Sequence, residues 1–211
     1  MAKIGIIGGS GLEDPSILKN PESAELETPY GDPSSILTTG RIYNTTSTAC
    51  GSLREEIDRG DLVILDQFID FTRLRKVSFY ESFEPGDMKH VPMADPFSET
   101  IRKNLIESAQ ELDLKFHPKG TVITIEGPRF STRAESRMFR SWGADVINMS
   151  IAPEAILANE LGIPYATIAM STDYDCWHED EEPVTWKEIL EIFNENVHNV
   201  LDLMLKTLPK L

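Results

Sequence analysis

The sequence has one pair of acids whose types and spacing best suit acid–base chemistry: Asp173 and Asp175, with a single residue between them. They follow the apolar run Tyr165 to Met170, which is typical of a short buried strand. Folds with α/β sheets bind ligands at the carboxyl ends of their strands. One acid could donate a proton to a heterocycle nitrogen while the other accepts hydrogen bonds from an amino group. The alternative is a polar strand end whose acids are solvated or cap a turn.

Two other stretches have residues that could hold an anion. Residues 8–12, Gly-Gly-Ser-Gly-Leu, follow the β-branched run Lys3 to Ile7, and the bare backbone amides of such a loop can face a phosphate. The dinucleotide-binding pattern G-x-G-x-x-G is incomplete there, because its third glycine is missing. Residues 48–52, Thr-Ala-Cys-Gly-Ser, offer hydroxyls and small side chains after an extended stretch. An ordinary tight turn is an equally good interpretation of either stretch.

Ser150 and Phe130 each lie between a predicted strand and a predicted helix. The strand 146–149 precedes Ser150, and the next helix is predicted to begin at Pro153. Ser150 therefore precedes a helix amino end, where free amides and the helix dipole favour an anion. Phe130 follows the predicted strand 120–126 and could stack on a flat ring, although an aromatic residue in a loop more often plugs the core.

Capping residues mark the starts of three helices that would flank these segments. Ser98 precedes apolar residues at helical spacing, and Thr132 with Glu135 forms a capping box. Thr185 with Glu188 does the same before the last helix. These helices would cover the faces of a sheet built from the apolar runs between them.

The strands expected before the first helix are less regular. Asp61 to Ile69 predicts one apolar strand, and Phe71 to Lys89 predicts an irregular segment with aromatic residues. Two further extended segments, Ser35 to Ile42 and Thr45 to Leu53, follow each other almost directly. No helix separates them, although consecutive parallel strands need a long crossover connection.

Composition limits the classes of protein to consider. The chain has 211 residues, 40% of them hydrophobic and 26% charged, which predicts a single globular domain over residues 1–211. The net charge of −15, without a basic cluster, argues against nucleic acid or an anionic membrane as partners. Cys50 and Cys176 have no metal-ligand or redox spacing, so we expect buried free thiols in a reducing compartment. With no signal peptide or membrane-length apolar run, we expect a soluble intracellular protein.

Five motifs in order resemble those of the S-methyl-5′-thioadenosine phosphorylases, a family of nucleoside phosphorylases. They are Ile6 to Leu12, Thr48 to Leu53, Ile125 to Phe130, Gly143 to Ser150 and Thr172 to Trp177. The resemblance covers nearly the whole chain. It implies an α/β fold, a three-layer sandwich with a central mixed sheet, and phosphorolysis of methylthioadenosine to adenine and 5-methylthioribose 1-phosphate in purine and methionine salvage. It also implies inorganic phosphate as co-substrate, no metal or organic cofactor, usually a homotrimer, and a cytoplasmic location with the nucleus as a further one.

The resemblance also implies roles for individual residues. Asp173 would protonate or hydrogen-bond the purine N7, Asp175 would serve the 6-amino edge, and Thr172 belongs to the same substrate-binding motif. A lone histidine near prolines, such as His90, is more often structural than catalytic. The resemblance implies that His90 contacts the methylthio end of the substrate bound in a neighbouring subunit. The remaining matched positions contact the base and ribose (Phe130 and Met149), the phosphate (Ser10, Thr48, Ala49 and Ser150) and the methylthio group (Trp186, where a small aliphatic residue is usual).

The chain departs from the family pattern next to Asn44. Family members carry a few dozen residues there, including an Arg-His-Gly that supplies the main cationic phosphate ligand. A C-terminal helix of the family is also absent after Leu211. Two hypotheses follow: a working phosphorylase in which another basic residue such as Arg54 or Arg129 replaces that ligand, or a shortened, catalytically impaired form that keeps the purine pocket or the subunit contacts. An oxidoreductase built on the first glycine loop is a distant third.

Overall fold

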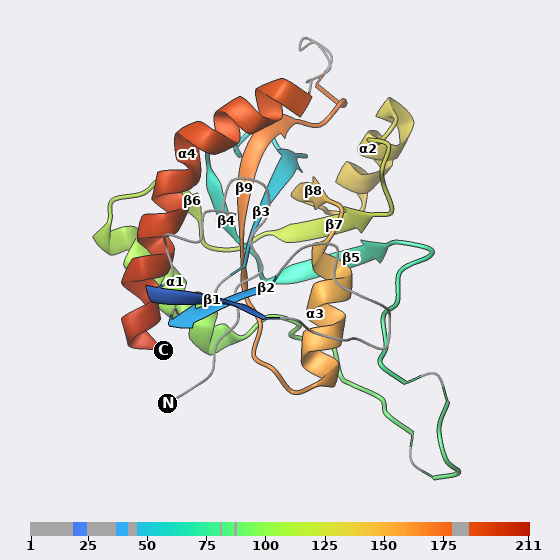
Figure 1. The fold of residues 1–211 in the computed structure, drawn as a ribbon. Helices are drawn as coiled ribbons and strands as arrows, with labels where there is room; N and C mark the ends of the chain where they lie inside the picture. The colour runs from blue at the N-terminus through green and yellow to red at the C-terminus, as the bar shows by residue number, and fades with distance from the viewer. Residues whose placement is uncertain (1–18, 25–36, 42–45, 81, 87, 179–185) are drawn as a thin grey trace.

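The computed structural model describes residues 19–24, 37–41, 46–80, 82–86, 88–178 and 186–211 (Figure 1). The predicted strand Lys3 to Ile7, the first glycine loop and the predicted cap at Thr185 lie outside these ranges. After five strands, the described chain alternates helices with strands, as the sequence predicts for an α/β fold.

The strands and helices have the following bounds. The strands are β1 (Lys19–Ala24), β2 (Leu37–Arg41), β3 (Thr46–Ser52), β4 (Leu62–Ile64), β5 (Gln67–Phe71), β6 (Phe116–His117), β7 (Thr121–Ile125), β8 (Val146–Asn148) and β9 (Thr167–Tyr174). The helices are α1 (Glu99–Glu111), α2 (Arg133–Ser141), α3 (Ile151–Glu160) and α4 (Trp186–Thr207), followed by the short 3-10 helix η2 (Leu208–Lys210).

Seven of these strands form one mixed sheet in the order β5-β7-β8-β3-β9-β4-β6. The pairs β5–β7, β7–β8, β3–β9 and β4–β6 are parallel, whereas β3–β8 and β4–β9 are antiparallel. The antiparallel pair β1–β2 makes a separate sheet. Since β2 and β3 belong to different sheets, the direct step from one to the other needs no crossover helix.

Helices cover both faces of the large sheet, as Figure 1 shows, and so confirm the predicted three-layer arrangement with a central mixed sheet. On one face α1 and α4 enclose an apolar core with β4 and β9, centred on Leu105, Ile168 and Leu203. On the other face α3 packs through Ile151 on β3 and β9. A third cluster joins Phe139 of α2 to the strands β7 and β8.

The predicted single strand from Asp61 to Ile69 is wrong, because two strands occupy it. β4 and β5 lie near opposite edges of the sheet, and the chain turns between them at Leu65 and Asp66. The buried side chain of Arg102 donates its Nε–H to the Leu65 carbonyl at 2.8 Å. Asp66 exchanges hydrogen bonds with Gly120, whose amide donates to the Asp66 carboxylate at 2.9 Å. These polar contacts replace the sheet hydrogen bonds that a continuous strand would make.

Two of the predicted helix starts are confirmed. Ser98 caps α1 by accepting a hydrogen bond from the Ile101 amide, and Thr132 with Glu135 forms the predicted capping box of α2. The third helix begins at Ile151 rather than at Pro153. Proline is tolerated in the first turn of a helix, where the missing N–H would have no intrahelical partner, so it did not mark the boundary.

Replacing Ile168 tests the core between β9 and the helices α1 and α4. This side chain is fully buried and packs in the centre of that cluster. We expect Ile168→Ala to lower the free energy of unfolding by about 2–5 kcal/mol, because it removes buried apolar atoms and leaves a cavity. Ile168→Val is the matched control, with an expected loss of about 0.5–1.5 kcal/mol. Urea denaturation measures both, and equal effects of the two variants would contradict this description of the core.

Candidate active site

The strands β3 and β8 separate next to a cavity. They pair only at Gly51 with Ile147 and at Ser52 with Val146. The first half of β3, from Thr46 to Cys50, pairs with β9 on its other side only, within the described residues. A cavity of about 330 Å³ opens beside the separated strands. Its walls come from the ends of β3, β8 and β9 and from the loop that precedes α2, and they comprise Thr48, Ala49, Cys50, Gly51, Ile125, Phe130, Ser131, Ile147, Asn148, Met149, Ser150, Thr172, Asp173 and Asp175.

A β-bulge in β9 directs the two acids toward this cavity. The parallel register with β3 runs from Thr46 opposite Thr167 to Cys50 opposite Ser171, and then shifts so that Gly51 lies opposite Asp173. Thr172 is the extra residue. Side chains alternate between the two faces of a strand. One inserted residue therefore places Asp173 on the opposite face of the sheet from the one it would occupy in a regular strand. Asp175, two residues further on, follows to the same face.

Gly51 of β3 lies next to both acids and to Ile147 of β8. A Cβ atom built on Gly51 would lie at ordinary contact distance from the acids, 3.4 Å from Asp173 Oδ2 and 3.5 Å from Asp175 Cβ, but only 3.1 Å from Ile147 Cγ2. The bare backbone of β3 therefore leaves room for the Ile147 side chain beside the acids. Sheet positions occupied by glycine often mark such a close approach.

Hydroxyl groups hold the two carboxylates. The Ser131 hydroxyl lies 2.8 and 2.7 Å from the two oxygens of Asp175. The Thr172 hydroxyl lies 2.7 Å from Asp173 Oδ1 and 3.3 Å from the Cys50 carbonyl. Both aspartates are only 8% exposed. They are thus held by neutral donors in a poorly hydrated site, where charge and proton transfer to a bound molecule have large effects.

The predicted strand at Ala166 to Met170 is correct in place but too short. β9 continues to Tyr174, so Asp173 lies within the strand and Asp175 directly after it. The residues from Ser171 to Asp173 are polar but buried, and polarity suggested the end of the strand. The sequence therefore placed the acids at the correct end of the correct strand and missed the bulge.

A chain of buried hydrogen bonds lies under the other side of the cavity. The Ala152 amide, in the first turn of α3, donates to the Thr124 hydroxyl at 3.1 Å, and that hydroxyl donates to Asn148 Oδ1 at 2.9 Å. Asn148 Nδ2 in turn donates to the Thr48 hydroxyl at 3.3 Å. This chain joins β7, β8 and β3 to the amino end of α3, so that Thr48 and Ser150 keep a fixed relation.

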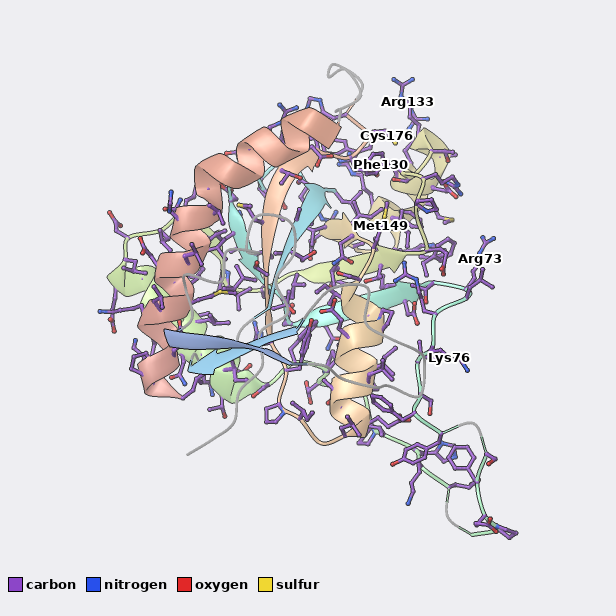
Figure 2. All side chains as sticks on the ribbon, viewed as in Figure 1. Arg73, Lys76, Phe130, Arg133, Met149 and Cys176 are labelled. Carbon is purple, nitrogen blue, oxygen red and sulfur yellow. The ribbon has the colours of Figure 1, made fainter. Side chains whose placement is uncertain are left out.

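Phe130 and Met149 form the apolar part of the wall. Figure 2 shows the two side chains at the end of the sheet where α2 lies. Phe130 is 54% exposed, so it is a rim residue and not the core plug that loop aromatics often are. Gly127 has a φ of +68°, and a Cβ built there would lie 2.6 Å from the Met149 sulfur. An exposed ring opposite a thioether can hold a flat apolar group between them.

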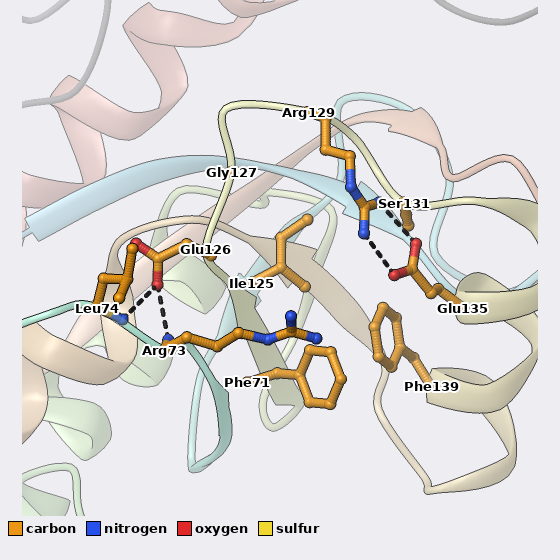
Figure 3. Close-up of a pocket in the computed structure, with 10 residues that line it drawn as sticks. All are labelled: Phe71, Arg73, Leu74, Ile125, Glu126, Gly127, Arg129, Ser131, Glu135 and Phe139. Atoms are coloured by element: carbon orange, nitrogen blue, oxygen red, sulfur yellow. Dashed lines mark hydrogen bonds and ion pairs between the residues drawn. The ribbon is translucent and has the colours of Figure 1, made fainter.

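Backbone hydrogen bonds and an ion pair hold the loop that carries Phe130 and Ser131. Figure 3 shows a second cavity, of about 320 Å³, on the far side of this loop. There Glu126 accepts hydrogen bonds from the backbone amides of Arg73 and Leu74 at 2.7 and 3.1 Å, which lower its pKa. Arg129 pairs with Glu135 through two contacts of 2.7 Å. The loop is therefore fixed at both ends.

No lysine, arginine or histidine is among the described residues that line the 330 Å³ cavity. Arg54, one suggested replacement for the family's cationic ligand, donates instead to Asp145 at 2.8 Å. Arg129, the other suggestion, is engaged with Glu135 and lines the second cavity. What the described wall offers an anion is the amino end of α3 after Ser150 together with hydroxyl and backbone groups of β3.

The remaining predicted site residues lie away from this cavity or outside the described ranges. Ser10 is outside them, and so is the side chain of Trp186, which is the first residue of α4. His90 is exposed on the long stretch between β5 and α1, which runs away from the sheet in Figure 1. Its role toward a neighbouring subunit stays a prediction.

Three residues of the site were missed by reasoning from the sequence. Ser131 directly follows Phe130, and its small polar side chain gave no sign that it would meet Asp175 across 44 positions. Asn148 lay inside a predicted strand, and a buried polar residue there could have been noticed. Gly51 was considered only as part of an anion-binding stretch or a turn, whereas it belongs to β3 and lies beside both acids.

Both cysteines are free. Burial, and then the nearby Asp173 carboxylate, raises the pKa of the Cys50 thiol well above its ordinary value. Cys176 is half-buried, so the prediction of a buried thiol holds only for Cys50. The described residues include no group of three or more acidic, histidine or cysteine side chains that could hold a metal ion. No helix in the described ranges is long and apolar enough to cross a membrane.

Comparison with known proteins identifies the family. The model of the phosphorylase superfamily matches residues 45–208. The chain is 46% identical to S-methyl-5′-thioadenosine phosphorylase of Xenopus tropicalis, in an alignment that covers 99% of this chain and 89% of the relative. This chain belongs to the S-methyl-5′-thioadenosine phosphorylase family. The family member of Danio rerio is 45% identical with the same coverage of both chains.

Solved structures of the family agree with the fold described above. Methylthioadenosine phosphorylase from Schistosoma mansoni in complex with adenine superposes with a TM-score of 0.90 at 34% identity, over 99% of this chain and 91% of that one. A mutant of the same enzyme in complex with methylthioadenosine gives a TM-score of 0.89 at 32% identity and the same coverage. The fold class and the family inferred from the five sequence motifs are thereby confirmed.

The alignments also show that the relatives carry residues that this chain lacks. The alignment with the Xenopus tropicalis phosphorylase extends over 250 positions, and that with the Danio rerio enzyme over 248, although this chain has 211 residues. The difference agrees with the segment that the sequence comparison found missing next to Asn44. In this member of the family, β2 and β3 flank that position.

Substituting Gly51 tests the packing of β3 against the wall of the cavity. In Gly51→Ala the new methyl group would be in ordinary contact with Asp173 and Asp175 but only 3.1 Å from Ile147 Cγ2, so the Ile147 side chain must shift by a few tenths of an ångström. Because Ile147 lines the cavity together with the acids, we expect turnover of the family's nucleoside substrate to fall by about tenfold. Far-UV circular dichroism should remain that of the wild type. Unchanged turnover would show that the site does not depend on the position of Ile147.

The pKa of Glu135 leads to a prediction about stability. Its ion pair with Arg129 and the Thr132 amide lower this pKa from 4.5 to about 2. A carboxyl group whose pKa is lower in the folded than in the unfolded state stabilises the fold at pH values above its unfolded-state pKa. This stabilisation is lost as the pH falls toward the folded-state pKa. Glu135→Gln should therefore be less stable than the wild type in urea denaturation at pH 6, and the difference should shrink steadily between about pH 4.5 and pH 2. A difference that does not change with pH would contradict the ion pair.

Proposed function

We propose that this protein cleaves S-methyl-5′-thioadenosine by phosphorolysis to adenine and 5-methylthioribose 1-phosphate, as a pentosyltransferase of purine and methionine salvage. The observation that carries the proposal is that Asp173, in β9, and Asp175, directly after it, both line one cavity with Phe130 and Met149. The relatives at 45–46% identity are phosphorylases of this substrate by name.

The acids serve the purine in this proposal. As the bond between C1′ and N9 breaks, negative charge develops on the leaving adenine, and a proton or hydrogen bond from Asp173 at N7 stabilises it. Asp175 accepts a hydrogen bond from the 6-amino group, and the Ser131 hydroxyl keeps its carboxylate in place. Acceptors at this edge favour a 6-aminopurine over a 6-oxopurine. Phe130 and Met149 contact the base and the ribose.

Inorganic phosphate, the co-substrate, would bind on the side of the cavity formed by β3 and α3. Thr48 and Ala49 of β3 and Ser150 before α3 line that side, and Ser10 of the first glycine loop is proposed to complete it. The helix dipole of α3 and the Ile151 amide support an anion there, since the Ala152 amide donates to Thr124 and Pro153 has no N–H. Aimed at C1′ from this side, the phosphate attacks the sugar as adenine leaves, and it needs no metal or organic cofactor.

We further propose that the protein is a homotrimer that acts in the cytoplasm and also in the nucleus. Large apolar side chains are exposed on the stretch between β5 and α1, including Leu74 at 86% and Met88 at 67%. Covering them with a second copy would remove apolar surface from water. The same stretch carries His90, which would then contact the methylthio end of the substrate in the neighbouring subunit, where Trp186 is also proposed to lie.

Adenine release from methylthioadenosine tests the proposed reaction. We expect the purified chain to release adenine only when phosphate is present. Asp173→Asn should lower kcat by at least about a hundredfold, because it removes the group that stabilises the leaving base. Asp202→Asn, at an exposed position of α4, is the matched control and should keep the wild-type rate.

Two results would contradict the proposal in different ways. A folded chain that binds adenine but releases none from methylthioadenosine would be a catalytically impaired member of the family. Release that does not depend on phosphate would mean that water is the nucleophile in place of phosphate.

A further inference from the structure

Tyr174 lies between the two acids and faces the other side of the sheet. It pairs with Ser52 of β3 directly after the bulge, whereas Asp173 pairs with Gly51. Successive side chains of a strand point to opposite faces. With Asp173 and Asp175 in the cavity, the half-buried Tyr174 side chain is therefore on the face away from it.

The Tyr174 hydroxyl is held by a charged pair. It donates to Asp58 Oδ1 at 2.8 Å, and Lys115 Nζ lies 2.5 Å from Asp58 Oδ2. Hydrogen bonds from Lys115 and then from Tyr174 lower the pKa of Asp58, so this carboxylate stays ionised as an acceptor. Lys115 also contacts Oδ1 of Asp61 at 3.0 Å, and the Asp61 side chain is only 3% exposed. The exposed pair is thus anchored to a buried acid.

The loop that carries these acids is also bonded to β9 before the bulge. The Gly60 amide donates to the Ser171 carbonyl at 2.7 Å, and the Ser171 amide donates to the Asp61 carbonyl at 2.9 Å. His117 Nε2 of β6 lies 3.0 Å from Asp61 Oδ2. One loop therefore holds β9 on both sides of the bulge, through backbone bonds at Ser171 and through a side chain at Tyr174.

Aromatic contacts with the residues that follow β9 hold the ring of Tyr174. It stacks on His178 with ring centroids 5.0 Å apart and meets Trp177 edge to face at 6.0 Å. The Trp177 indole donates to the Ser52 carbonyl of β3 at 2.8 Å. Replacing Tyr174 by phenylalanine would keep these ring contacts and remove the hydroxyl, which donates to Asp58 and lies 3.5 Å from the Glu55 carbonyl.

We propose that Tyr174 is a positioning residue for the reaction: its hydroxyl, held by Asp58 and Lys115, fixes the rotation of β9 after the bulge and so the direction in which Asp173 and Asp175 enter the cavity. The inference rests on the proposed function. A bulge interrupts the regular ladder, and the residues after it are held to β3 only at Gly51 and Ser52. Since the acids flank Tyr174 on one backbone, a rotation there moves both of them together.

The test compares Tyr174→Phe with the wild type in steady-state kinetics and in equilibrium binding of adenine. We expect kcat with methylthioadenosine to fall about tenfold and the Kd of adenine to rise about threefold or more, because both depend on the direction of the acids. The KM for phosphate should not change, since phosphate is proposed to bind on the side of β3 and α3. Asp58→Ala should have the same effects, because it removes the acceptor of the Tyr174 hydroxyl, and combining the two substitutions should add little to either alone.

Asp202→Asn is the control, because this exposed carboxylate of α4 belongs to none of the contacts of Tyr174, and it should keep the wild-type values. Wild-type kcat and adenine Kd in Tyr174→Phe would overturn the proposal. A lower kcat with an unchanged adenine Kd would also overturn it, because a loss of folded molecules alone gives that result. If the wild type binds adenine but releases none, the proposed function fails, and the adenine Kd of Tyr174→Phe still decides whether Tyr174 positions the acids.

Discussion

The parallel pairing of β3 with β9, interrupted by the bulge at Thr172, is the constraint on which the rest of the site depends. It brings two carboxylates to one face beside a glycine, while the other neighbour of β3 separates and leaves space for a ligand. Helices on both faces keep these central strands buried, so the site lies at the edge of a rigid core. Catalytic groups on strands of a packed sheet are held more precisely than groups on loops.

The electrostatics of the site follow from this arrangement. Each acid is hydrogen-bonded by a hydroxyl group, and the described wall of the cavity carries no cationic side chain. Two neighbouring carboxyl groups in a poorly hydrated site favour binding of a group that can share a proton or donate hydrogen bonds. The amino end of α3, which Ser150 joins to the cavity, favours a negatively charged group instead. The cavity thus has carboxyl groups on one side and a helix amino end on the other.

The sequence was a good guide where local chemistry determines structure. The caps Ser98 and Thr132 each make hydrogen bonds with residues three positions away, and the helices that they begin were predicted. The single strand predicted over residues 61–69 failed because apolar runs do not say which strands pair, and the turn there depends on Arg102 and Gly120. The bulge and Ser131 were invisible for the same reason: both act through contacts between residues far apart in the chain.

The separation of β2 and β3 into different sheets has a consequence for how the family can vary. Where consecutive strands are neighbours in one sheet, a change in the length of their connection alters the path of the crossover that packs on the sheet. Here β2 ends in a small two-stranded sheet and β3 begins in the middle of the large one, and the sequence motifs predict that the relatives carry their extra residues at this join. Evolution could therefore lengthen or shorten the chain at this position without changing the register of β3 against β9, the pairing that orients the acids.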